Sequence, residues 1–151
     1  MRTFVIVLSS TTSMILGGAV YLLWRPESLR MFSWFSSLGV AQPVASMREW
    51  AAPFSHILPS WACLSLPQSL WLLSGCLAIH LIWRDCFSTE EQLWMVAVLL
   101  LAIGGELGQA AGVVQGVFDP QDVVLILVAF LAAQAAAHAD TMAAEMGRVS
   151  K

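Results

Sequence analysis

Charged residues are scarce in this 151-residue chain. Seven Lys and Arg and ten Asp and Glu make up 11% of it, whereas an ordinary soluble domain carries roughly 25%. So few charges cannot cover the surface of a domain of this length in water. Because 58% of the residues are hydrophobic, with seven Trp and seven Phe, the sequence predicts an integral membrane protein.

Basic residues and cysteines are also few, and each shortage excludes a kind of site. The formal net charge is −3, so the chain lacks the positive charge on which nucleic-acid binding depends. The three cysteines have neither the spacing of a zinc site nor the even number of a disulfide framework. The three histidines fall at different predicted depths. We therefore expect no nucleic-acid partner, no metal and no cofactor.

Four segments are long and apolar enough to cross a bilayer as helices: residues 4–24, 66–83, 93–114 and 120–138. The first would be about 32 Å long as a helix, which matches the hydrocarbon core of a bilayer. It follows Arg2 and is predicted to be an uncleaved signal-anchor. The expected fold is an all-α, four-helix transmembrane bundle in a single membrane domain, 1–151, with a tail at 139–151.

The basic residues in the connections predict the orientation of the chain in the membrane. Four spans place both termini on one side of the membrane, and that side collects Arg2, Arg84, Arg148 and Lys151. The other side collects Arg25, Arg30 and Arg48. The larger count predicts cytoplasmic termini.

The connection 25–65 contains too many aromatic residues for an ordinary exposed loop. Pro26 and Glu27 suit the first turn of a helix. The apolar residues of this predicted helix fall on one side of it: Met31, Phe32, Trp34, Phe35 and Leu38. We expect this helix to lie in the membrane interface, Gly39 to end it, and Pro43 to begin a second short helix. The segment is predicted to pack as a cap over the bundle, and a mobile proline-rich loop is the alternative.

Glu106 is the outstanding polar residue within the spans. An ionisable group at such a depth is costly and usually has a partner or a function. Gln109 follows three residues later, so both side chains project from one face of the third span. Two interpretations stay open. The carboxyl group either hydrogen-bonds between helices, for example to the Ser and Thr run of the first span, or belongs to a ligand-binding or catalytic site.

Small residues recur every four positions in the third and fourth spans: Gly104, Gly108, Gly112 and Gly116, then Ala129, Ala133 and Ala137. Such stripes let two membrane helices approach closely. The third and fourth spans are therefore predicted to form a tight antiparallel pair. The glycine stripe, Gly104, Gly108 and Gly112, also offers a contact for a membrane protein partner.

Asp119 and Asp122 fit the start of the fourth span without any ligand. Asp119 suits the N-cap position, Pro120 the first helical position and Asp122 the third. His80 is a lone imidazole within the second span, and for it a contact between helices is favoured over a ligand role.

Two motifs with fixed spacing occur in the second half of the chain: E-x-x-Q from Glu106 to Gln109, and G-x-F-D-x-x-D from Gly116 to Asp122. Together they resemble the signature of VanZ-like membrane proteins. The sequence Leu-Pro-Gln-Ser-Leu-Trp at 66–71 is similar to an L-P-x-x-L-W element of the short members of that family. The resemblance implies a helical bundle in a bacterial envelope. The founding member of the family is linked to glycopeptide (teicoplanin) resistance, and no biochemical activity is settled for the family.

This resemblance implies a candidate site near the non-cytoplasmic face, formed by Glu106, Gln109, Phe118, Asp119 and Asp122. With Arg25, Arg30 and Arg48 facing them from the cap, these residues are expected to bind a lipid or a cell-wall or glycopeptide-related ligand. The protein is expected in the bacterial cytoplasmic (inner) membrane, in contact with membrane lipids. A structural or assembly subunit of a larger membrane complex, or an immunity-type binder, is the alternative. An intramembrane enzyme with Glu106 and Asp119 as acid and base is a third, and no catalytic residue is assigned.

Overall fold

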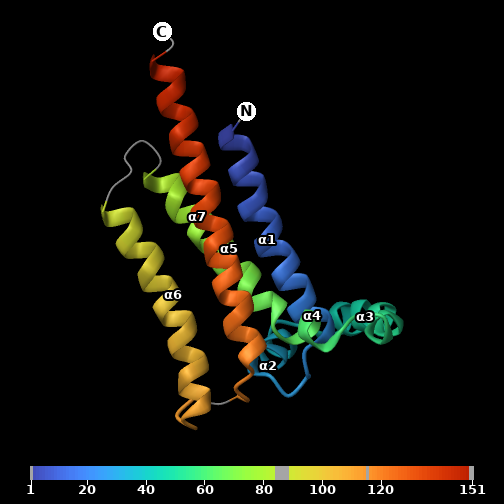
Figure 1. Cartoon of the computed structure of the whole chain (residues 1–151). Coiled ribbons are helices and arrows are strands. Elements are labelled where there is room, and N and C mark those ends of the chain that lie inside the picture. Colours follow the sequence, from blue (N-terminus) through green and yellow to red (C-terminus); the bar gives the residue numbers. More distant parts are fainter. Residues whose placement is uncertain (1, 84–88, 115, 150–151) are drawn as a thin grey trace.

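The computed structural model describes residues 2–83, 89–114 and 116–149. Every regular element in this part of the chain is a helix, in the order α1 (Arg2–Trp24), α2 (Arg30–Ser37), α3 (Ala41–Ala51), the 3-10 helix η1 (Ala52–His56), α4 (Ser60–Leu64), α5 (Leu66–Trp83), α6 (Thr89–Ala110) and α7 (Pro120–Val149). Four of these, α1, α5, α6 and α7, are long and apolar enough to cross a membrane. The predicted all-α bundle with four transmembrane helices is confirmed (Figure 1).

α1 begins and α7 ends at the same end of the bundle, as an even number of spans requires (Figure 1). We call this the termini end. The opposite end, where α1 and α6 end and α5 and α7 begin, is called the cap end. Two residues used to predict the orientation, Arg84 and Lys151, lie outside the described residues. The cytoplasmic location of the termini therefore stays a prediction.

Gly112 ends α6 earlier than the sequence predicted. It has a φ of 70°, a left-handed conformation that glycine adopts without strain. The N–H of Gly112 donates to the carbonyl of Gln109 (3.0 Å), and the N–H of Val113 donates to the carbonyl of Gly108 (2.9 Å). This pair of bonds is a Schellman motif. α6 thus runs to Ala110 rather than to residue 114, because the glycine counted as part of a packing stripe stops the helix.

α5 is the central helix of the bundle. It contacts α1, α6 and α7, and its contacts with α1 and α7 are the most extensive between spans. The buried core contains Ile6, Leu72, Cys76, Leu77, Met95, Ile126, Ala129, Ala133 and Ala137. The alanine stripe of α7 therefore lies in the core, and α7 packs more against α5 than against α6.

The predicted tight pairing of α6 with α7 through glycines is wrong. A side chain added at Gly104 would meet no atom within 4 Å, and one added at Gly108 would meet Val114 of the following turn. Gly112 lies beyond the helix. Small residues allow a close approach without enforcing one, so a stripe alone does not identify the neighbouring helix.

Between two spans, the closest approach through a glycine of the described residues joins α1 to α5. A Cβ atom at Gly17 would lie 2.7 Å from Trp71 Nε1 and 3.0 Å from the backbone oxygen of Pro67. One turn farther along α1, the centre of the Tyr21 ring lies 5.1 Å from that of the Trp71 ring. Nearer the middle of the bundle, the Ser10 hydroxyl donates to the carbonyl of Ser74 (3.0 Å).

Gly17→Ala is expected to lower the free energy of unfolding by about 1–3 kcal/mol, because the new methyl group overlaps the Trp71 ring and lies in tight contact with the backbone oxygen of Pro67. Gly18→Ala is the matched control, since a side chain there would meet nothing within 4 Å. Reversible unfolding in mixed micelles by titration with sodium dodecyl sulfate measures both variants. Equal stability of the two would contradict this account of the α1–α5 contact.

The middle of residues 25–65 lies beside α1 rather than over the bundle. α3 and η1 contact α1, and α4 contacts both α1 and α5. Figure 1 shows α3 projecting sideways from the cap end of α1. The predicted cap over the bundle is therefore wrong for α3 and η1, and we call the segment 25–65 the lateral cap. It leaves the start of α7 and the end of α6 uncovered by α3 (Figure 1).

The helices of the lateral cap follow the sequence signals with one exception. α2 begins at Arg30 rather than at Pro26, because the N–H of Leu29 instead closes a turn on the carbonyl of Pro26 (3.4 Å). Gly39 ends α2 with a φ of 73°, as predicted. Pro43 lies in the first turn of α3, where its missing N–H leaves no helical bond unmade.

Candidate functional site

The predicted site residues gather at the cap end. Glu106 and Gln109 lie in the last turns of α6, and Asp122 lies in the first turn of α7. Phe118 and Asp119 precede α7 directly and are half-buried. The reversal of the chain between α6 and α7 thus brings the two motifs together.

Glu106 joins three spans. Its side chain is 1% exposed and makes side-chain hydrogen bonds with Gln68 of α5 and Asp122 of α7. A hydrogen bond between two carboxyl groups requires a proton on one of them. Among the two interpretations of Glu106, the interhelical contact is present, but its partner is not the Ser and Thr run of α1. Ser10 in that run bonds to α5 instead.

Two carboxylate oxygens in this cluster are buried without a hydrogen-bond partner, Glu106 Oε2 and Asp122 Oδ1. Leaving a buried acceptor unsatisfied costs roughly 1–3 kcal/mol, and more for a charged group. Asp122 as a whole is half-buried, so it reaches the surface, whereas Glu106 lies behind it. The cluster can therefore accept further hydrogen bonds.

Gln109 contacts Gly116 rather than Glu106. A Cβ atom at Gly116 would lie 2.6 Å from Gln109 Cδ and 2.7 Å from its Oε1, and Gly116 has a φ of 146°. Both the space and the backbone conformation therefore require glycine at this position. The E-x-x-Q and G-x-F-D motifs are joined by this contact as well as by the Glu106 and Asp122 pair.

Asp119 is the N-cap of α7, as the sequence predicted. Its Oδ1 accepts a hydrogen bond from the N–H of Gln121 (2.9 Å), and its carbonyl accepts one from the N–H of Asp122 (3.0 Å). Capping accounts for one of the two acids in the motif. Asp122 turns its side chain toward Glu106.

Arg48 attaches the lateral cap to the end of α1. Its guanidinium donates to the carbonyl of Leu22 and to that of Arg25 (2.9 Å), and it lies 4.7 Å from the centre of the Phe32 ring. The last carbonyl groups of a helix lack helical partners and carry partial negative charge, so a cation stabilises them. An ion pair with exposed Glu27 (3.5 Å) adds little.

The other two arginines have different surroundings. Arg25 donates to the carbonyl of Leu64, stacks 5.3 Å from the Tyr21 ring centre, and acts electrostatically on Glu106. Arg30 is exposed on α2. The structure thus brings Arg25 toward the carboxylates and directs Arg48 to backbone carbonyl groups. Sequence patterns contain no sign of such backbone partners.

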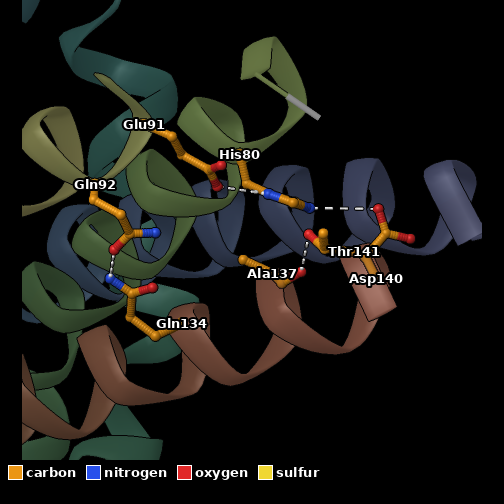
Figure 2. Close-up of polar contacts among 7 residues, drawn as sticks. All are labelled: His80, Glu91, Gln92, Gln134, Ala137, Asp140 and Thr141. Atoms are coloured by element: carbon orange, nitrogen blue, oxygen red, sulfur yellow. Dashed lines mark hydrogen bonds and ion pairs between the residues drawn. The ribbon is translucent and has the colours of Figure 1, made fainter. Parts of the chain in front are cut away.

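A second polar cluster lies at the termini end (Figure 2). The predicted contact of His80 between helices is confirmed, whereas its partners were not predicted. His80 of α5 is flanked by Glu91 of α6 and Asp140 of α7. Its Nδ1 lies 2.7 Å from Glu91 Oε1, and its Nε2 lies 3.4 Å from Asp140 Oδ2. The side chains of His80 and Glu91 are 1% exposed and that of Asp140 is 5% exposed.

This cluster joins the same three spans as Glu106 does. Next to this cluster, Gln134 donates to Gln92 (2.8 Å) and adds a bond between α7 and α6 (Figure 2). The two acids face opposite nitrogens of one ring, so they cannot share a metal ion with it. Within the described residues no group of three or more such side chains is placed to hold a metal.

Comparisons with protein-family models, with curated proteins and with solved structures find no match. The molecule is therefore defined by its own residues. It is a four-span helical membrane protein whose last three spans are joined by a buried polar cluster at each end.

Proposed function

We propose that the chain is a VanZ-like integral membrane protein of the bacterial inner membrane that binds a lipid or a cell-wall or glycopeptide-related ligand at the cap end. One observation carries the proposal. The three segments on which the resemblance rests meet at one point, through Gln68, Glu106 and Asp122. Segments far apart in the sequence that converge on a buried carboxyl group within a membrane are typical of a functional site.

The chemistry of the cluster supports ligand binding. Glu106 and Asp122 each retain a buried oxygen without a hydrogen-bond partner, and Asp122 reaches the surface. The site lies close to the end of each span, where head groups of lipids and lipid-linked precursors lie. In this proposal the termini are cytoplasmic and the cap end faces the opposite side.

The alternative is an assembly subunit of a larger membrane complex, or an immunity-type binder. It is favoured by the outer face of α6, where Leu101 is 79% exposed and a side chain at Gly104 or Gly105 would meet nothing within 4 Å. A partner helix can approach such a face closely. A stoichiometric protein recovered with the chain in mild detergent, and lost in Gly104→Leu, would favour this alternative.

Native mass spectrometry of the chain extracted from bacterial membranes in mild detergent tests the proposal. We expect a retained small-molecule adduct whose occupancy falls about tenfold in Glu106→Gln and in Asp122→Asn, the loss expected for one charge-assisted hydrogen bond. Glu145→Gln, an exposed acid near the other end of α7, is the matched control. Equal adduct occupancy in all four proteins would contradict the proposal. So would full complementation of a deletion strain by Glu106→Gln and Asp122→Asn chains that insert normally.

A further inference from the structure

Unpartnered buried polar atoms are concentrated at the cap end. Among the described residues, five of seven such atoms lie there: Trp24 Nε1, Arg25 Nε, Ser65 Oγ, Glu106 Oε2 and Asp122 Oδ1. Native structures satisfy nearly all buried polar atoms, so a cluster of exceptions indicates a missing polar partner. Ser65 is itself 1% exposed and lies one helical turn before Gln68, the partner of Glu106. The partner is therefore expected beside the start of α5.

The charges at this end select the kind of partner. Arg48 is committed to the carbonyls of Leu22 and Arg25, and Arg25 donates to the carbonyl of Leu64. The acceptors left without donors are carboxylate oxygens of Glu106 and Asp122. The donors left without acceptors are Trp24 Nε1 and Arg25 Nε. A zwitterionic head group complements both sets, because its ammonium offers N–H donors to the carboxyl oxygens and its phosphate accepts from the indole and the guanidinium.

An apolar groove adjoins the same turn of α7. It has a volume of about 350 Å³ and is lined by Trp61, Pro120, Gln121, Val124 and Leu125. Asp122 follows Gln121 directly in the chain and turns toward α6. Trp61 belongs to α4, four residues before the unpartnered Ser65. The groove therefore places an apolar surface in the same turn of α7 as Asp122, at the cap end of the spans.

We propose that the cap end binds a phospholipid that carries a primary ammonium group. This inference rests on the proposed function and names the class of its ligand. The ammonium group binds at Asp122, which shares one proton and therefore one negative charge with Glu106, and an acyl chain lies in the groove between Trp61 and the first turns of α7. Because Glu106 Oε2 and Asp122 Oδ1 are both buried, the ammonium approaches from the half-buried side of Asp122, and the Asp122 side chain rotates outward to meet it.

Lipids with identical acyl chains and different head groups test this inference. The purified, delipidated protein is titrated with phosphatidylethanolamine, phosphatidylcholine or phosphatidylglycerol, and native mass spectrometry measures the bound fraction. We expect phosphatidylethanolamine to bind at least about tenfold more tightly than the other two, because choline has no N–H donor and glycerol no positive charge. Asp122→Asn is expected to remove the preference.

Two further variants separate the head-group site from the groove. Val124→Trp fills the groove and is expected to weaken all three lipids alike, whereas Leu131→Trp, at an exposed position farther along α7, is expected to leave binding unchanged. Tight binding of phosphatidylglycerol that depends on Asp122 would overturn this inference and leave the proposed function standing. Binding of all three lipids that is unaffected by Asp122→Asn and Glu106→Gln would overturn both.

Discussion

Replacing His80 with leucine is expected to lower the free energy of unfolding by about 3–5 kcal/mol. The ring lies between two buried carboxyl groups, with contacts of 2.7 Å to Glu91 and 3.4 Å to Asp140. Removing one member of a buried charged network leaves the others in a medium that solvates them poorly. Titration with sodium dodecyl sulfate in mixed micelles measures the loss.

His138→Leu is the matched control, because His138 is exposed on α7, two residues before Asp140. Its replacement should change the free energy of unfolding by no more than about 0.5 kcal/mol. A double-mutant cycle of His80→Leu with Glu91→Gln then isolates the contact itself. We expect a coupling energy of about 0.5–3 kcal/mol. Strictly additive losses would show that His80 stabilises the bundle by packing alone.

Replacing Arg48 with methionine is expected to release the lateral cap from α1. Two charge-assisted hydrogen bonds to backbone carbonyls are lost, together about 3 kcal/mol. Methionine keeps a long side chain and removes the charge, and with it the stacking of the guanidinium on Phe32. Amide hydrogen exchange in Ala41–Ala51, followed by mass spectrometry, should therefore become roughly 100-fold faster, while exchange in α5 stays unchanged.

Arg30→Met is the natural control, since Arg30 is a second arginine of the lateral cap and is exposed on α2. Its replacement should leave the exchange rates of α3 within a factor of about two. Equal acceleration by both substitutions would contradict this account. It would show that the overall positive charge of the lateral cap, and not the attachment of Arg48 to the end of α1, holds the segment in place.

The spans could be predicted from the sequence because hydrophobic length depends on few details. α5 covers the residues predicted, Leu66–Trp83. The boundary at Gly112 could not be predicted in the same way, because a glycine suits a packing stripe and a helix C-terminus equally well. Only its positive φ decides between them. The helix that packs against each span could not be predicted either. The alanine stripe of α7 packs against α5, although its spacing fits a contact with α6 equally well.

The candidate site was predicted in part. Asp119 as an N-cap follows from local spacing, and the convergence of both motifs follows from the short reversal between α6 and α7. The surroundings of His80 depend on residues 11 and 60 positions away, and a single helical wheel cannot relate them. The sequence predicts Arg48 at the ligand site, whereas in the structure its guanidinium donates to main-chain carbonyl oxygens. Such partners cannot be predicted from a sequence pattern, because every residue has a carbonyl oxygen.

The two polar clusters at opposite ends of α5, α6 and α7 fix the positions of these helices relative to one another along their axes. The apolar faces between the clusters tolerate sliding, because a shift by one turn, about 5.4 Å, replaces one aliphatic contact with another. The same shift would separate Glu106 from Gln68 and His80 from Glu91 at once. Insertion of the last three spans is therefore expected to end in one alignment, reached when both ends have found their partners.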